Sequence, residues 1–366
     1  MVSIFEPYRM GDLELTSRIV MAPMTRSRAL QHRPDDDTVL YYQQRAGAGL
    51  IISEGTPVTQ EGRGYAFTPG IYAPDQIAGW ARVTDAVHAA GGNIFCQLWH
   101  VGRQSHSSLQ RGGGAPVCSS VRRARIEAWG FDANGVASSL PATEPRALET
   151  EEMPRITAEF VAAARNAIAA GFDGVEIHGA NGYLFEQFIN GDLNQRTDRY
   201  GGSIANRLRF PLETLDAVSA AIGGSRTGIR LAPFGRFGDM AAFDDEEETW
   251  LTMARDLSAR DIAYVHISDQ ETLGAQAIPA GFVDKFRAAY SGRLIVAGGY
   301  EKDSAQQALD SGRADLVAIG RPFIGNPDLI ERYRHGWPVV VPDRATFYSG
   351  GQRGYVDYPV YRAPSP

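Results

Sequence analysis

The chain has 366 residues, of which 43% are hydrophobic and 22% charged, and its formal net charge is −7. This is the composition of a soluble globular enzyme with a large core, and its acidity argues against nucleic acid as the main partner. No apolar run is long enough to span a bilayer and no export signal is visible, so we expect a cytoplasmic protein without a membrane partner. Two cysteines cannot build a disulfide framework, and Cys96, inside an apolar strand, is expected to be a buried structural thiol.

Strand-like and helix-like segments alternate along most of the chain. A hairpin from residue 11 leads into an apolar strand over 18–24, and further strands are predicted over 49–54, 93–99, a run ending at His178, 227–233, 263–268, 293–297 and 316–320. The predicted helices cover 38–46, 75–90, 157–170 with Thr157 as its cap, a stretch ending at Ile222, 246–258, 281–290, 304–310 and 327–333. About eight such units predict an α/β fold, the (β/α)8 TIM barrel, formed by residues 1–366 as one domain.

The alternation stops between residues 101 and 142, after the third strand. This stretch contains a run of three glycines, 112–114, and several arginines. Structureless loops of such length are usually functional, so we expect an excursion over the barrel mouth, formed by a hairpin that acts as a lid.

A polar cluster ends the fourth predicted strand. His178 and Asn181 offer two hydrogen-bond donors, and Tyr183 adds a phenol that is protonated at neutral pH. Active sites of parallel barrels lie at the carboxyl ends of the strands, and two donors with an acid suit a carbonyl group. An equally good interpretation of the cluster alone is that His178 ties down a loop and Tyr183 is a wall residue.

The other strand ends supply polar residues and glycines. Glycines after the seventh and eighth strands and the adjacent Arg321 predict a phosphate site, although such glycines also serve in tight turns. Gln97 and Arg230 are expected to donate hydrogen bonds to a planar ring with imide edges. Flavin mononucleotide (FMN) carries both such a ring and a phosphate. A structural hydrogen-bond network would use the same two side chains.

Metal and Schiff-base chemistry are disfavoured by the sequence. The histidines form no metal-binding motif; His88 and His335 are expected on solvated helix surfaces, and His100 and His266 in supporting positions near the mouth. Both lysines, Lys285 and Lys302, fall in predicted helices rather than at strand ends.

Long motifs in a fixed order are similar to those of one known family. They cover residues 18–26, 41–54, 97–103, 178–183, 196–203 with 206–207, 320–328, 347–348 and 354–359. Over nearly its whole length the chain resembles the Old Yellow Enzyme family of FMN-dependent ene-reductases.

The resemblance implies a single FMN-binding domain and assigns roles residue by residue. Non-covalent FMN would contact Pro23, Met24, Thr25, Gly55, Gln97, Arg230, Gly298, Gly299, Gly320 and Arg321. His178 and Asn181 would bind the carbonyl or nitro oxygen of the substrate, Tyr183 would donate a proton, and Tyr65, Trp99 and Tyr348 would wall the pocket.

The implied reaction is a ping-pong transfer of hydride from NAD(P)H, with NADPH favoured, through flavin N5 to the β-carbon of an activated alkene. Tyr183 would protonate the α-carbon. The alternatives are a nitrate-ester or nitro-compound reductase on the same site and, in a different class, a non-catalytic flavin-binding redox sensor. The expected partners are small molecules, and the chain is expected to be a monomer or a homodimer.

Three departures from the family pattern stand out. Asn181 is the second donor where part of the family carries a second histidine, Gly55 replaces a commoner alanine, and Thr272 lies where relatives often carry a bulky aromatic residue. The last two predict a roomier pocket. The segment 121–139 resembles no one subgroup and leaves the substrate open.

Overall fold

A closed barrel of eight parallel strands forms the centre of the protein. The computed structural model describes residues 2–274, 277–348 and 350–362. The barrel strands are β3 (Ile19–Met21), β4 (Leu50–Ile52), β6 (Ile94–Trp99), β11 (Gly174–Gly179), β12 (Thr227–Leu231), β13 (Tyr264–Ser268), β14 (Leu294–Ala297) and β15 (Leu316–Ile319). They follow one another around the sheet, and pairing of β11 with β6 closes it. The predicted TIM barrel is confirmed.

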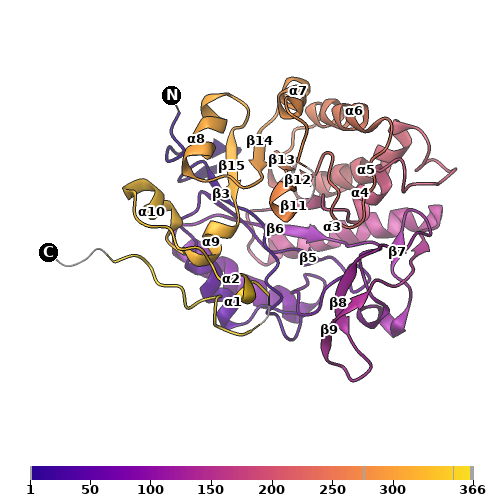
Figure 1. The fold of residues 1–366 in the computed structure, drawn as a ribbon, viewed down its shortest axis with the longest axis horizontal. Helices are drawn as coiled ribbons and strands as arrows, with labels where there is room; N and C mark the ends of the chain where they lie inside the picture. The colour runs from indigo at the N-terminus through magenta and orange to yellow at the C-terminus, as the bar shows by residue number, and fades with distance from the viewer. Residues whose placement is uncertain (1, 275–276, 349, 363–366) are drawn as a thin grey trace.

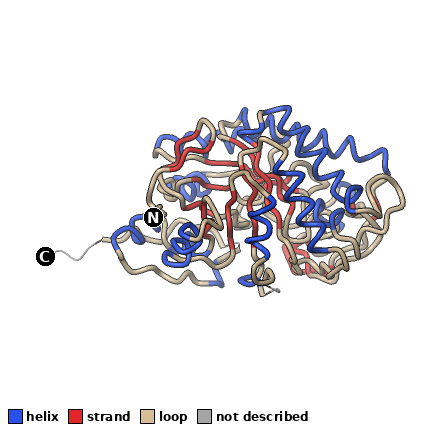
Figure 2. The backbone as a smooth tube through the Cα atoms, turned by 90° about the horizontal axis from the view of Figure 1, so that it is seen from above, coloured by secondary structure: helices blue, strands red, loops and turns tan. Residues whose placement is uncertain are grey.

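Helices surround the strands, as Figures 1 and 2 show. Those predicted between strands are α1 (Asp36–Gln43), α2 (Pro74–Ala89), α3 (Met153–Ala169), α5 (Ile204–Ile222), α6 (Glu246–Ser258), α7 (Phe282–Ala289), α8 (Lys302–Asp310) and α10 (Leu329–His335). Two short helices, α4 (Leu184–Ile189) and α9 (Arg321–Gly325), were not predicted. No helix of the described part of the chain is both long and apolar enough to cross a bilayer.

The start of α3 differs from the prediction. The helix begins at Met153 with Pro154 in its first turn, a position where proline needs no backbone N–H. The cap assigned to Thr157 is therefore wrong: its hydroxyl lies inside the helix, 3.0 Å from that of Thr214 on α5.

An N-terminal hairpin closes the end of the barrel opposite the mouth. Its strands are β1 (Tyr8–Met10) and β2 (Leu13–Leu15), joined by a turn in which Gly11 has a φ of +60°. Met10 and Leu15 are fully buried in one cluster with the residues that fill the barrel interior. The hairpin begins before residue 11, where its start was expected, because Gly11 belongs to the turn.

The excursion contains the expected hairpin. Strands β8 (Glu127–Phe131) and β9 (Ala137–Pro141) pair antiparallel and project from the barrel (Figure 1). The excursion also contains η1 (Ser107–Leu109), η2 (Arg111–Gly113) and β7 (Val117–Cys118). Outside it lie the short strand β5 (Thr56–Pro57), which precedes it, and β10 (Arg146–Ala147) and η3 (Thr150–Glu152), which follow it. Elsewhere the chain forms η4 (Gly224–Arg226), η5 (Glu271–Leu273) and η6 (Arg344–Thr346).

Candidate active site at the barrel mouth

Alternation along each strand decides which side chains face the barrel axis. In β11, Val175 and Ile177 pack outward in the main core, so Glu176 and His178 point inward. In β6 the buried thiol of Cys96 likewise faces outward, and burial raises its pKa to about 12, in agreement with a structural role. The inward side chains near the mouth are Gln97, Trp99, Glu176, His178, Arg230, His266 and Ser268.

His178 is fixed as a neutral hydrogen-bond donor. Its Nδ1 lies 3.3 Å from the backbone nitrogen of Ala180, whose N–H it accepts, so its own proton is assigned to Nε2. Burial, together with the positive charge of Arg230, holds the pKa of His178 well below its usual range. The neutral ring can donate through Nε2 towards the mouth.

Tyr183 is a protonated phenol inside an aromatic cluster. Its ring meets those of Trp99 and His178 edge to face, with centroids 5.0 and 4.9 Å apart. Its hydroxyl lies 3.3 Å from that of Tyr65. Burial raises the pKa of Tyr183 well above its usual value, so the group is an acid rather than a phenolate at neutral pH.

Asn181 is held by its backbone and by its side chain. It has a left-handed φ of +58°, a conformation that asparagine tolerates better than most residues. Its main-chain oxygen accepts from Nε2 of Gln104 at 2.8 Å, and its Oδ1 accepts from Nε2 of Gln270 at 3.0 Å. The structure thus brings His178, Asn181 and Tyr183 together at one strand end; their catalytic roles stay predictions.

A buried carboxylate beneath this cluster was missed by the sequence analysis. Glu176 has no exposed surface; one oxygen accepts from Nε2 of Gln97 at 2.8 Å and the other lies 2.8 Å from Nδ1 of His266. The signal was present in the sequence, since Glu176 shares the inward alternation of His178. His266 lies behind the mouth, in the supporting position expected for it.

The hydrogen-bonding groups that Gln97 and Arg230 leave unused fit one edge of a flavin ring. Glu176 accepts one N–H of the Gln97 amide, which leaves the amide oxygen and the second N–H for other partners. Arg230 donates to the hydroxyl of Ser268 at 2.9 Å, while its buried Nε has no partner in the described part of the chain. An imide presents both an N–H and carbonyl oxygens, which complements an amide oxygen beside a guanidinium. The donation expected from both residues stays a prediction, because the NH₂ group of Gln97 keeps a second N–H.

On the side of the mouth opposite His178, main-chain turns at glycines shape the site. Gly298 and Gly299 follow β14 with φ values of +148° and +77°. A Cβ at Gly298 would lie 2.5 Å from that of Asp269, so no other residue fits without movement. Gly320 follows β15, and the exposed Arg321 begins α9 beside it. A close turn next to an arginine fits the predicted phosphate group.

Pro23, Met24 and Thr25 follow β3 and are half-buried between these two sides of the mouth. A Cβ at Gly320 would lie 3.5 Å from the sulfur of Met24, so these two residues are neighbours. The predicted flavin-lining positions after β3 and β15 are therefore adjacent.

Arginines after β3 hold the C-terminal segment over the mouth. Arg26 donates to the carbonyls of Phe347 at 2.9 Å and Gly354 at 2.8 Å, and Arg28 donates to that of Gly351 at 2.8 Å. This segment carries Tyr348, which is 62% exposed and raises the pKa of both Tyr65 and Tyr183 by its proximity, although burial is the larger cause. Tyr348 is thus an exposed residue near Tyr65 and Tyr183, and its place in the pocket wall stays a prediction.

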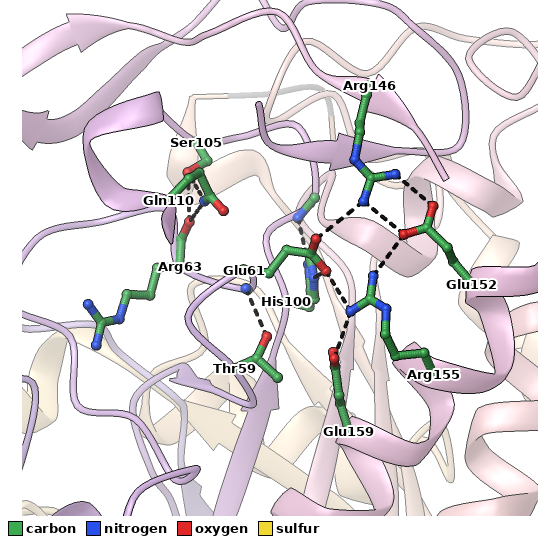
Figure 3. A network of polar contacts seen from close by, with 12 residues as sticks. Thr59, Glu61, Arg63, His100, Ser105, Gln110, Arg146, Glu152, Arg155 and Glu159 are labelled. Carbon is green, nitrogen blue, oxygen red and sulfur yellow. Dashed lines mark hydrogen bonds and ion pairs between the residues drawn. The ribbon is translucent and has the colours of Figure 1, made fainter. Parts of the chain in front are cut away.

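The loop that carries Tyr65 is tied down on two sides (Figure 3). On one side Glu61 forms ion pairs with Arg155 of α3 at 3.0 Å and with Arg146 of β10 at 3.5 Å. On the other, the carbonyl of Arg63 accepts from Ser105 at 2.7 Å. These contacts connect a pocket residue to the excursion and to α3.

The hairpin of the excursion reaches the pocket wall directly. Tyr65 forms an isolated bridge with Trp129 of β8, and the N–H of Ala66 donates to the carbonyl of Trp129 at 2.7 Å. Tyr65 in turn stacks on Trp99, with centroids 5.4 Å apart. The segment 121–139 thus supports the wall formed by Tyr65.

Gly55 does not enlarge the pocket as expected. A Cβ at this position would lie 2.5 Å from Cε3 of Trp99, so the indole already fills the space that alanine would take. The missing methyl group permits the close approach of Trp99 to the backbone. The side chain of Thr272 lies outside what the structure describes.

Comparisons with known proteins agree with this geometry. Residues 3–339 match the model of the NADH:flavin oxidoreductase / NADH oxidase family. Putative 12-oxophytodienoate reductase 11 from Oryza sativa subsp. japonica is 43% identical over 360 residues, covering 97% of each chain. 12-Oxophytodienoate reductase 2 from Arabidopsis thaliana is 41% identical over 362 residues, which cover 98% of this chain and 96% of the relative.

Solved structures of similar proteins superpose on nearly the whole of this chain. Morphinone reductase in complex with tetrahydroNAD superposes with a TM-score of 0.95 at 46% identity, covering 99% of this chain and 98% of that one. The Old Yellow Enzyme homologue from Zymomonas mobilis gives a TM-score of 0.93 at 39% identity, covering 98% of this chain and all of that one. The barrel fold, the residues gathered at its mouth and the matches to known proteins define a flavin-dependent oxidoreductase built on a parallel barrel. Within that class, the chain belongs to the Old Yellow Enzyme family.

Proposed function

We propose that this protein is an FMN-dependent ene-reductase that reduces the C=C bond of α,β-unsaturated carbonyl or nitro compounds. The observation that carries the proposal is the convergence of His178, Asn181 and Tyr183 at the carboxyl end of β11. Bound FMN would supply the redox chemistry, taking a hydride from NAD(P)H and passing it to the β-carbon of the alkene. The chain's own residues would bind the substrate, polarise it and supply the proton.

Polarisation of the alkene falls to the two donors. Nε2–H of His178 and the amide NH₂ of Asn181 would bind the substrate oxygen, where negative charge grows as hydride reaches the β-carbon. Because both donors are fixed from behind by other hydrogen bonds, they need no reorganisation during the reaction. Each such donor contributes roughly 10²–10³ in rate.

Proton delivery falls to Tyr183. Its high pKa keeps the phenolic proton in place until the α-carbon becomes basic. The neighbouring hydroxyl of Tyr65, 3.3 Å away, would accept or donate a hydrogen bond as the charge on Tyr183 changes. Trp99 and Tyr65 cover this side of the pocket and restrict the access of water.

Gln97, Arg230 and the glycine turns after β14 and β15 would hold the cofactor. Arg230 would stabilise negative charge on the ring, and the close turn at Gly298 would admit the phosphate. The reductant is a nicotinamide dinucleotide; the preference for NADPH is a prediction to be tested with both forms, since one solved relative carries an NAD analogue.

The visible absorption spectrum of the purified protein tests the proposal. A flavin spectrum that bleaches with NADPH or NADH under anaerobic conditions, and returns on addition of cyclohexenone, is the expected result. A protein that bleaches but is reoxidised only by a nitrate ester would favour the alternative reductase. A flavin that does not bleach would favour a redox sensor, and a colourless protein that cannot be loaded with FMN would remove the cofactor from the proposal.

A further inference from the structure

A buried glutamine outside the predicted site forms a hydrogen bond with the side chain of Asn181. Gln270 follows β13, is 1% exposed, and lies where the loops after β11, β12 and β13 meet. Its Oε1 accepts from the backbone N–H groups of Arg236 at 2.8 Å and Phe237 at 2.9 Å. Its Nε2 donates to Oδ1 of Asn181 at 3.0 Å.

Only a glycine at position 235 leaves room for this arrangement. A Cβ there would lie 2.7 Å from Nε2 of Gln270. The side chain of Gln270 is therefore enclosed by the loop after β12 and has one direction in which its NH₂ group can point. That direction leads to Asn181.

The hydrogen-bond pattern decides which end of each amide is oxygen. Oxygen and nitrogen of an amide have nearly the same shape, so only their partners distinguish them. Two backbone N–H groups face one end of Gln270, which makes that end the acceptor and the other end the donor. The atom of Asn181 that faces this donor must be an oxygen, so its NH₂ group lies on the opposite side.

No second hydrogen bond competes for this NH₂ group. Nδ2 of Asn181 donates to no residue of the described part of the chain, whereas the main chain of Asn181 is fixed by Gln104 and by its left-handed φ. The contact with Gln270 is the hydrogen bond that opposes rotation of the amide. A rotated amide would place an oxygen where the substrate's own oxygen binds.

We propose that Gln270 is a positioning residue that holds Asn181 with its NH₂ group towards the substrate oxygen and so makes the second subsite of the oxyanion pocket a donor. The proposal rests on the proposed function, because it takes His178 and Asn181 as the residues that bind this oxygen. Each donor of the pair then has its own support: the N–H of Ala180 for His178, and Gln270 for Asn181.

The substitution Gln270→Glu tests the proposal because it keeps the shape and both contacts to Arg236 and Phe237. A carboxylate has no N–H, so Asn181 turns to donate to it and presents its oxygen to the ligand. The probe is 4-hydroxybenzaldehyde at pH 8, titrated into the FMN-loaded enzyme and followed by the flavin absorption and by calorimetry. We expect its Kd to rise at least ten-fold, with the FMN content and Tm close to those of the wild type.

A double-mutant cycle separates positioning from general structure. In an Asn181→Ala background there is no amide to turn, so Gln270→Glu should change the Kd of the phenol less than two-fold. The variant Gln270→Met lets the amide of Asn181 take both orientations and should weaken binding less than Gln270→Glu. If Gln270→Glu does not fold, Gln270→Met takes its place in the double-mutant cycle.

Three results would overturn the proposal. They are unchanged phenol binding by Gln270→Glu, an equal loss with and without Asn181, and a larger loss with methionine than with glutamate. A wild-type holoenzyme that binds no phenol at all would instead count against the proposed function, so the two failures are distinct.

Discussion

The two sides of the barrel mouth are built on different principles. On the His178 side, residues 178–183, the candidate chemistry lies in side chains, and each of these side chains has a hydrogen-bond partner in another residue. On the Gly298 side, comprising Gly298, Gly299 and Gly320, these glycines carry no side chain, and backbone conformation determines the shape beside Arg321. A side that must donate and protonate needs functional groups, whereas a side that encloses a phosphate needs close backbone approach.

This difference predicts which property of the enzyme a substitution on each side impairs. A substitution on the His178 side should remove a chemical step and leave the cofactor bound. A substitution on the Gly298 side should loosen the cofactor and leave the remaining active molecules chemically intact. The variants below test this division, from the largest expected effect to the smallest.

Tyr183→Phe should slow alkene reduction by roughly 10²–10⁴, the usual contribution of a positioned general acid. Reduction of the flavin by NAD(P)H should stay largely unaffected, because that half-reaction needs no proton from Tyr183. Stopped-flow absorption measures the two half-reactions separately. The control is Tyr290→Phe, which removes another buried phenol far from the mouth. An equal loss in both half-reactions would refute the assignment of Tyr183 as proton donor.

Gly298→Ala should weaken FMN binding by about 10- to 100-fold, since forcing a methyl group into filled space costs about 1–3 kcal/mol. Fluorescence titration of the apoprotein with FMN measures this directly. Gly312→Ala is the matched control: Gly312 also has a positive φ, +68°, but no atom lies within 4 Å of its added Cβ. It should lower the free energy of unfolding by about 1–2 kcal/mol without changing FMN affinity. Equal losses of affinity in both variants would mean that backbone strain, rather than the crowding at Asp269, is responsible.

The sequence was sufficient for features that depend on local pattern. Alternating strands and helices predicted the barrel, and an abrupt change from apolar to polar residues located the cluster at 178–183. Thr157 was misassigned because a proline three residues earlier looks like a break, although the first turn of a helix accepts one.

Features that depend on distant contacts could not be predicted in this way. Gln270 and Asn181 are 89 residues apart, and Arg26 and Phe347 are 321 apart. The inward direction of Glu176 matters only once strands β6 and β13 place Gln97 and His266 beside it. Gly55 was interpreted as empty space because the sequence does not show that Trp99 occupies it.

Glu186 should give the His178 side a dependence on pH. Its buried carboxyl accepts the N–H of Gly182 at 2.8 Å, and burial raises its pKa to about 8 from an ordinary 4.5. The folded chain therefore keeps a proton that the unfolded chain releases, so folding stability falls as pH rises between about 4.5 and 8. Relative to Glu186→Gln, the wild type should lose about 1.4 kcal/mol of unfolding free energy per pH unit in this window. Urea denaturation of both proteins at pH 5, 6 and 7, with FMN held at one concentration, measures the difference. A difference that stays constant with pH would mean that the carboxyl of Glu186 is already ionised in the folded protein and supports Gly182 as a carboxylate.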